Sequence, residues 1–196
     1  MRVLGIMGSP RKDGNTEFLL ARALEEAEKN GTQTHHVSLA DRRIEPCNVC
    51  RACDKEPSCP KNDDMSDIYQ ELIKADGIIV SSPVYFGNVS GQLKSMMDRT
   101  LIFRRGDRRM LRNKVGAAIA VGGIRSGGQE IVCEAIHAWM LAHDMIVVGD
   151  GSHYGGTGCG SYDLHTASTD NLGMESCRNV GKRIAEVLKL LRETRS

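Results

Sequence analysis

Short runs of apolar, often β-branched residues alternate along the chain with longer stretches in which apolar residues recur every three or four positions. The short runs predict buried strands, and the longer stretches predict amphipathic helices. The expected strands cover residues 2–7, 34–39, 77–82, 115–121 and 145–149. The expected helices cover residues 15–29, 63–75, 91–101, 129–143 and about 168–192. This alternation is typical of an α/β domain with a parallel sheet.

The alternation continues through the chain without a shift in composition, so we expect residues 1–196 to form a single domain. Lysine plus arginine number 26 and aspartate plus glutamate number 25, a formal charge of +1. This balance lacks the basic field that binds nucleic acid or an anionic membrane surface. The sequence has neither the run of roughly 18–20 apolar residues that a membrane span needs nor a signal-peptide pattern, so we expect a cytoplasmic protein.

The loop after the first expected strand has the composition of a phosphate site. Residues 8–16 read Gly-Ser-Pro-Arg-Lys-Asp-Gly-Asn-Thr and lead into a helix. Ser9 and Thr16 supply hydroxyl groups, and Asn15 supplies an amide. Arg11 adds charge-assisted hydrogen bonds, and the helix start adds free backbone N–H groups. The glycine spacing differs from those of P-loops and dinucleotide fingerprints, which favours a terminal monophosphate. The alternative is an ordinary turn with a helix cap.

Two further loops place aromatic residues and glycines at the same edge of the expected sheet. Residues 81–90 read Ser-Ser-Pro-Val-Tyr-Phe-Gly-Asn-Val-Ser, in a chain that is only 4% aromatic. Tyr85 and Phe86 are suited to hold a planar heteroaromatic ring, or else they pack into the core. Gly122 and Gly123 follow the fourth strand and either let a flat ligand approach the backbone or serve only as turn residues. Ligands of doubly wound sheets lie beyond the carboxyl ends of the strands, where these loops meet.

Together the loops resemble those of the flavodoxin-like NADPH-dependent FMN reductase superfamily. The match rests on residues 8–16 and 82–90, followed by Leu-Lys at 93–94 and Asp-Arg at 98–99. The resemblance implies a flavodoxin-like, doubly wound three-layer α/β sandwich with five parallel strands in the order 2-1-3-4-5. It implies non-covalently bound FMN, with the phosphate at Ser9, Arg11, Asn15 and Thr16. The isoalloxazine ring is then expected against Pro83, Val84, Tyr85, Phe86, Gly87 and Asn88, with Gly122 and Gly123 at its other edge.

Four of the seven cysteines crowd into residues 44–62, after the second expected strand, as Cys47-x2-Cys50-x2-Cys53-x5-Cys59-Pro60. In a reducing compartment such crowding indicates metal or redox chemistry, and an odd total fits a disulfide framework poorly. The spacing resembles bacterial ferredoxin motifs, although the last gap is five residues and not three. Among flavodoxin-like proteins the segment resembles that of the iron-sulfur flavoproteins, which carry one [4Fe-4S] cluster and one FMN per subunit. The resemblance implies that Cys47, Cys50, Cys53 and Cys59 are the cluster ligands.

Two other interpretations of the cysteine segment stay open. Four thiolates also suit a structural Zn²⁺, although zinc sites usually pair two Cys-x-x-Cys units across a longer gap. Alternatively the segment holds no metal, and the protein is an NAD(P)H-dependent FMN or quinone reductase or a non-enzymatic flavin-binding redox sensor. Cys133, Cys159 and Cys177 have no partner spacing and are expected to be buried packing residues.

The resemblance to the iron-sulfur flavoproteins implies an electron-transfer oxidoreductase without a catalytic side chain. It implies a homo-oligomer, a dimer or tetramer, in which the cluster of one subunit approaches the flavin of another. Ferredoxin or another electron carrier is the expected donor, and O₂, H₂O₂ or a quinone the acceptor. The arginine-rich residues 104–112 are expected either to dock an acidic carrier or an NADPH phosphate, or to form a solvated or subunit-bridging loop. Residues 151–161 begin a long connection, which indicates a functional or interface element.

Overall fold

The computed structural model alternates strands and helices as the hydrophobic pattern predicts, and it describes residues 1–161, 163 and 166–194. The first half contains β1 (Arg2–Met7), α1 (Asn15–Lys29), β2 (Gln33–Ser38), α2 (Met65–Lys74), β3 (Gly77–Pro83) and α3 (Gly91–Arg99). The second half contains β4 (Val115–Gly122), α4 (Gln129–Ala142), β5 (Ile146–Val147), β6 (Gly156–Cys159) and α5 (Asn171–Glu193). Short 3₁₀ turns are η1 (Ala52–Asp54), η2 (Thr100–Phe103), η3 (Arg105–Asp107) and η4 (Thr166–Thr169).

The described strands pair in parallel in the order β2-β1-β3-β4-β5, which confirms the predicted topology. β3 and β4 form the centre, in register from Gly77 opposite Val115 to Pro83 opposite Val121. Every residue of β4 is buried, as expected of a central parallel strand covered on both faces. β5 pairs with the start of β4, and β6 pairs with its end. Two short strands therefore share the fifth position of the sheet.

This split corrects two expectations. The strand expected over residues 145–149 is only Ile146–Val147, and the connection expected over residues 151–161 contains β6. The chain leaves the sheet because the Asp150 carboxylate accepts hydrogen bonds from the backbone N–H groups of Ser152 and His153, which forms a turn. β6 reads Gly-Thr-Gly-Cys, so no apolar run signals a strand, and its pairing with β4 fixes it there.

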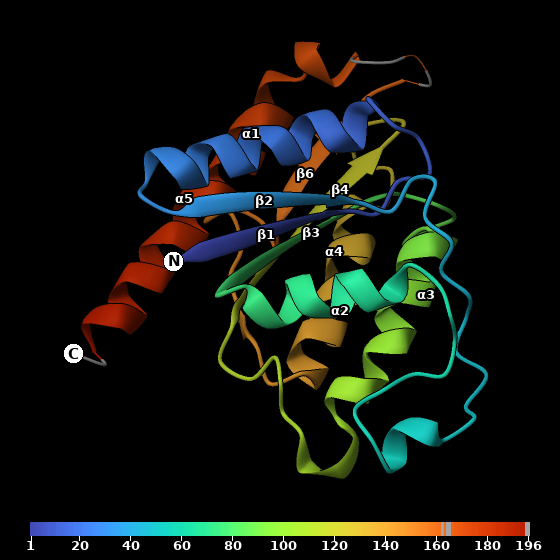
Figure 1. Cartoon of the computed structure of the whole chain (residues 1–196). Helices are drawn as coiled ribbons and strands as arrows, with labels where there is room; N and C mark the ends of the chain where they lie inside the picture. Colours follow the sequence, from blue (N-terminus) through green and yellow to red (C-terminus); the bar gives the residue numbers. More distant parts are fainter. Residues whose placement is uncertain (162, 164–165, 195–196) are drawn as a thin grey trace.

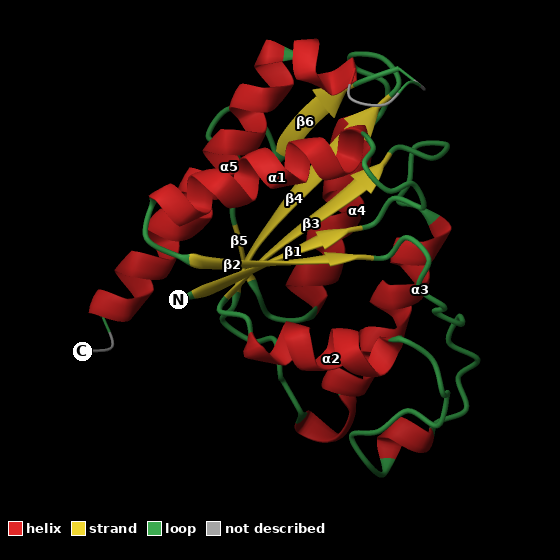
Figure 2. Cartoon of the chain, turned by 45° about the horizontal axis from the view of Figure 1, so that its top comes forward, coloured by secondary structure: helices red, strands yellow, loops and turns green. Residues whose placement is uncertain are grey.

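Helices α1 and α5 cover one face of the sheet, and α2, α3 and α4 cover the other (Figure 1). Gly181 of α5 lies so close to α1 that a Cβ atom there would be 2.0 Å from the carbonyl oxygen of Ala23. Only glycine permits this approach. The loops after β1, β3 and β4 emerge together at the carboxyl ends of the strands (Figure 2). Residues 44–62 lie beyond α2 and α3, away from α1 and α5 (Figure 1). Among the described residues, no helix is long and apolar enough to cross a membrane.

Candidate functional site

The loop between β1 and α1 surrounds the open start of a helix. Gly14 occupies the N-cap position in an extended conformation, and no described side chain caps the helix there. Ser9 and Thr16 are both buried beside it, and Ser9 Oγ accepts a hydrogen bond from the backbone N–H of Arg11 at 3.1 Å. Uncapped N–H groups and the positive end of the helix dipole favour an anion. The structure thus gathers the predicted phosphate-site residues, while their contact with a phosphate stays a prediction.

The side chain of Asn15 is already engaged. Its Nδ2 donates to the carbonyl oxygens of Ser161, at 2.9 Å, and Asp163, at 3.1 Å. Its Oδ1 accepts from the backbone N–H of Ala167 at 2.9 Å. The amide therefore fastens these residues to the start of α1, and it is not directed at a ligand as predicted. Asn15 is also the first residue of α1, so its backbone N–H lies at the open start of the helix.

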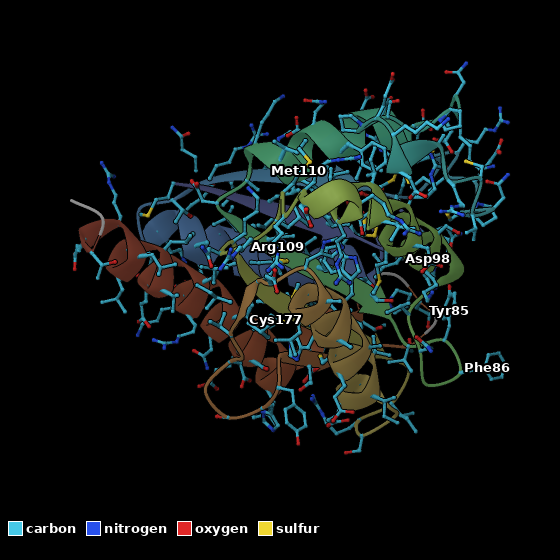
Figure 3. The ribbon with its side chains drawn as sticks, turned by 90° about the horizontal axis from the view of Figure 1, so that it is seen from below. Tyr85, Phe86, Asp98, Arg109, Met110 and Cys177 are labelled. Atoms are coloured by element: carbon cyan, nitrogen blue, oxygen red, sulfur yellow. The ribbon has the colours of Figure 1, made fainter. Side chains whose placement is uncertain are left out.

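The loop after β3 ends in a tight turn that presents two aromatic rings. Tyr85 and Asn88 exchange both backbone hydrogen bonds, at 2.9 and 3.0 Å. Between them Phe86 and Gly87 have φ values of +50° and +71°, a region that bulky residues rarely adopt. Phe86 is fully exposed and Tyr85 is 43% exposed; Figure 3 shows Phe86 pointing away from the rest of the molecule. The alternative that these rings pack into the core is therefore wrong.

Hydrogen bonds join the three loops into one unit. Ser90, the N-cap of α3, donates its hydroxyl hydrogen to the carbonyl oxygen of Gly8. The backbone N–H of Gly8 donates in turn to the carbonyl oxygen of Ser81 at 2.8 Å. The backbone N–H of Val84 donates to the carbonyl oxygen of Val121 at 2.9 Å. The candidate phosphate loop and the candidate ring loops are therefore fixed relative to one another, as a flat phosphorylated ligand requires.

Gln129, which the sequence analysis missed, organises the glycine-rich loop after β4. Its buried side chain accepts from the backbone N–H of Gly127 at 2.7 Å and donates to the carbonyl oxygens of Ile124, at 2.8 Å, and Gly158, at 3.2 Å. A Cβ atom at Gly122 would lie 2.5 Å from Gln129 Nε2. The loop conformation therefore needs both a glycine and this amide, and a single glutamine at the start of an apolar helix carries no local signal of that role.

Asp170 joins the end of β6 to the start of α5. Its Oδ1 accepts from the backbone N–H of Gly173, which caps α5, and its Oδ2 accepts from that of Cys159 at 2.7 Å. Burial opposes the charge, but these N–H donors and Arg125 hold the pKa of the carboxyl below its ordinary value. Asp170 precedes an amphipathic stretch, so its cap role had a sequence signal; its bond to β6 had none.

The four cysteines of residues 44–62 line one cavity that opens to solvent. Cys50 is exposed, and the other three are partly buried. In the part of the chain that the structure describes, no three cysteine, histidine, aspartate or glutamate side chains converge as the ligands of one ion would. The opposite wall is formed by residues of α2, α3 and the turns after α3: Tyr69, Arg99, Leu101, Ile102 and Arg105.

A buried ion pair closes the base of the cysteine segment. The guanidinium of Arg99 donates to Asp63 Oδ2 at 2.7 Å and to Asp63 Oδ1 at 3.1 Å, and both side chains are almost completely buried. Arg99 also donates to the carbonyl oxygen of Glu45 at 2.8 Å, and the backbone N–H of Glu45 donates to Asp63 at 2.9 Å. Both ends of the segment are therefore fixed to the end of α3.

Two side chains of the arginine-rich segment contact the cysteine segment directly. Arg108 donates to the carbonyl oxygen of Cys53 at 2.8 Å, and Arg105 Nε lies 3.1 Å from Asp54 Oδ1. Arg109 points away from the cavity and pairs with Asp144 at 3.0 Å. Two of the arginines therefore fasten the turns after α3 to the cysteine segment, which gives this stretch a structural function as well as a basic surface.

The donor set of the cavity fits an anionic iron-sulfur cluster. Thiolates are soft ligands, suited to iron-sulfur clusters, zinc or copper(I). The Nε atoms of Arg99 and Arg105 are buried without a hydrogen-bond partner among the described residues, and both arginines line the cavity. The Nε–H of Arg99 has no acceptor among the described residues, and that of Arg105 has only the ion pair with Asp54. Because buried donors are nearly always paired in folded proteins, these groups beside four thiols indicate a ligand that supplies acceptors and negative charge.

Known proteins with similar sequences include flavin reductases and iron-sulfur flavoproteins. Residues 1–158 match the family of NADPH-dependent FMN reductases. An iron-sulfur flavoprotein of Methanocaldococcus jannaschii is 48% identical over 196 residues, which cover 98% of this chain and 100% of that protein. An iron-sulfur flavoprotein of Methanosarcina thermophila is 44% identical over 195 residues, 100% of this chain and 99% of that protein. This chain belongs to the iron-sulfur flavoproteins, within the NADPH-dependent FMN reductase family. It is therefore a flavin-dependent redox protein.

Solved structures confirm the flavodoxin-like fold of this iron-sulfur flavoprotein family member. RosB superimposes with a TM-score of 0.80 at 15% identity, covering 99% of this chain and 81% of that chain. A WrbA-like flavodoxin from Agrobacterium tumefaciens gives a TM-score of 0.69 at 18% identity, covering 96% and 98%. At these identities the likeness shows the fold alone.

The three cysteines outside the segment fall into two kinds. Cys133 and Cys177 are buried in the core as predicted, and burial raises the pKa of the Cys133 thiol to about 12. Cys159 is only partly buried, so the prediction that it is buried is wrong for this residue. It is the last residue of β6, at the edge where the chain leaves the sheet.

Proposed function

We propose that this protein transfers electrons between FMN and a [4Fe-4S] cluster held by Cys47, Cys50, Cys53 and Cys59. One observation carries the proposal: a single cavity is lined by four cysteines and by two arginines whose buried Nε atoms have no hydrogen-bond partner among the described residues. The names of relatives that match the chain over nearly its full length support it. A zinc ion would also satisfy the thiols, and metal analysis of the purified protein distinguishes the two.

The flavin is assigned to the three joined loops. Ser9, Arg11, Thr16 and the backbone of Asn15 would hold its phosphate at the open start of α1, where the helix dipole favours a dianion. Residues 83–88 would contact the ring, with Gly122 and Gly123 at its other edge. FMN exchanges one or two electrons and a cubane exchanges one, so the pair links one-electron and two-electron carriers. The side chains bind and orient the groups, and none is required as a general acid.

Helix α3 connects the two candidate sites. Ser90 caps its start and is bonded to the phosphate loop, and Arg99 at its end lines the cysteine cavity. A helix of this length spans about 13 Å. The sites are thus held on one rigid element within a subunit.

A homo-oligomer, dimer or tetramer, is part of the proposal. In it the cluster of one subunit approaches the flavin of another. The fully exposed Phe86 and the exposed Val49, on the cysteine segment, support such an assembly because large apolar side chains exposed at functional loops mark contact surfaces.

The electron donor is proposed to be ferredoxin or another acidic electron carrier, and the acceptor O₂, H₂O₂ or a quinone. The arginine-rich residues 104–112 support an acidic donor, because they lie directly against the cysteine segment. Opposite charges at a docking surface accelerate encounter, and salt weakens them. Electron delivery by ferredoxin is therefore expected to slow as ionic strength rises.

Anaerobic stopped-flow absorbance tests the function. The oxidised protein is mixed with reduced ferredoxin or with NADPH, and bleaching of the flavin band is followed in the wild type and in Cys50→Ser. The proposal predicts bleaching by ferredoxin that the substitution slows strongly. Rapid bleaching by NADPH at the same rate in both proteins would instead identify a reductase that uses no cluster.

A further inference from the structure

We propose that Arg99 and Arg105 hold buried N–H donors for the cluster and that Arg105 raises its reduction potential. The inference rests on the proposed function, because it needs a cluster in the cysteine cavity. It assigns a positioning and tuning role to two residues outside the cysteine motif. Arg99 is the last residue of α3, and Arg105 is the first residue of the turn η3.

Arg99 is fixed in place by other contacts. Its two terminal nitrogens bond to the Asp63 carboxylate and to the carbonyl oxygen of Glu45. Tyr69 donates its hydroxyl hydrogen to the carbonyl oxygen of Arg99 at 3.0 Å. The Nε atom alone is buried without a partner among the described residues. Because the rest of the guanidinium is held by these contacts, this N–H has a fixed position in a residue that lines the cavity.

Arg105 differs from Arg99 because its charge is only partly neutralised. Its Nε lies 3.1 Å from Asp54 Oδ1, but the N–H is not aligned on that oxygen, and both atoms lack a hydrogen-bond partner among the described residues. The other oxygen of Asp54 accepts from Arg51 Nε at 2.9 Å. Asp54 is thus shared by two arginines.

The local charge balance at the cavity is positive. Among the cations that line the cavity, Arg51 and Arg105 share the carboxylate of Asp54, Arg99 pairs with Asp63, and Lys61 pairs with Glu45. Four cations against three carboxylates leave one positive charge in excess. Reduction adds one electron to a cluster that already carries negative charge. A nearby cation and N–H donors to sulfur stabilise the reduced state more than the oxidised one, and hydrogen bonds to the sulfurs are known to set cluster potentials.

Two substitutions separate the charge of Arg105 from its hydrogen bond. Arg105→Gln removes the charge and the guanidinium, whereas Arg105→Lys keeps the charge and removes the Nε donor. Arg109→Gln is the matched control, because it removes the same charge from a side chain that pairs with Asp144 outside the cavity. The full-length protein is purified anaerobically, and iron, sulfide and FMN are determined before any potential is measured. The cluster potential is then titrated by electron paramagnetic resonance, and the FMN potential is measured in the same samples.

We expect Arg105→Gln to lower the equilibrium constant for cluster reduction about tenfold, which is 59 mV for a one-electron couple. Arg105→Lys is expected to give a smaller shift in the same direction, and Arg109→Gln no shift beyond error. Cluster potentials in Arg105→Gln equal to those in Arg109→Gln, with full iron content, would overturn the inference and leave the proposed function standing. A wild-type cluster potential in Arg105→Lys would overturn the proposed hydrogen bond from Arg105 Nε to the cluster. A wild type without iron would overturn the proposed function itself.

Discussion

Arg99 and Asp63 form a buried, bidentate ion pair that joins the end of α3 to both ends of the cysteine segment. Asp63 directly follows that segment, and Glu45, bonded to both partners, lies at its start. The cavity that the cysteines line is therefore closed by two residues outside the cysteine motif. Its shape depends on a contact that residues 47–59 do not make themselves.

Replacing Asp63 by asparagine is expected to destabilise the fold and to release the segment. The substitution leaves the buried Arg99 charge without its partner, which costs about 3–5 kcal/mol. Thermal unfolding and iron analysis measure the two effects together. The matched control is Asp98→Asn, which breaks an exposed pair with Lys94 on the same helix and should cost no more than about 1 kcal/mol. Equal melting temperatures for the two variants would show that the buried pair is not required.

The contribution of the thiols is tested one at a time. Cys50 is the most exposed of the four, so Cys50→Ser disturbs packing least. We expect this variant to lose most of its iron and to keep its FMN, because the flavin loops lie at the other end of α3. Iron, sulfide and flavin analysis of Cys159→Ser, a partly exposed cysteine outside the segment, provides the control. Retention of a full cluster in Cys50→Ser would contradict the ligand assignment.

The phosphate loop makes a prediction about ligand discrimination. Arg11→Ala removes a charge-assisted hydrogen bond worth about 1.5–3 kcal/mol, so FMN affinity should fall roughly 10- to 100-fold. Riboflavin, which lacks the phosphate, should bind both proteins alike, and isothermal titration with the flavin-free protein measures both constants. Lys12→Ala is the control, since that neighbouring cation is exposed and pairs with Asp41. An equal loss of riboflavin affinity would place Arg11 at the ring and not at the phosphate.

A buried histidine makes stability depend on pH. Thr100 donates its hydroxyl hydrogen to the carbonyl oxygen of Met97, so its Oγ1 accepts from Trp139 Nε1 and from His143 Nε2, which must carry the proton. Burial, aided by Arg104, lowers the pKa of His143 to about 4. The unfolded chain binds the second imidazole proton near the ordinary pKa of about 6.5, so the folded state binds fewer protons between these two pH values.

Stability is therefore fully present above pH 6.5 and is lost as pH falls toward 4, by about 1.4 kcal/mol per unit and about 3 kcal/mol in total. His143→Gln should reduce this slope. Burial lowers the pKa values of His36 and His137 as well, so part of the slope remains. Melting temperatures of the wild type and the variant are measured across this pH range. Equal pH dependence of the two melting temperatures would contradict the role given to His143.

The sequence predicted the elements whose own residues specify them. The stripe of α1 and the apolar runs of β3 and β4 place helix and strands almost to the residue. β6 escaped prediction because Gly-Thr-Gly-Cys is a strand only through its pairing with β4. The cysteine spacing located the cavity, but the pairing of Arg99 with Asp63 joins positions far apart in the chain and leaves no local trace. Asn15 was correctly placed at the loop, yet its amide bonds to residues near η4.

The central claim, that one chain holds both FMN and an iron-sulfur cluster, is tested most directly by composition. The full-length protein is purified without oxygen, and iron, acid-labile sulfide, zinc and FMN are determined in the same sample. The account predicts about four iron and four sulfide per FMN and no stoichiometric zinc. A yellow protein that contains FMN but neither iron nor sulfide would contradict it.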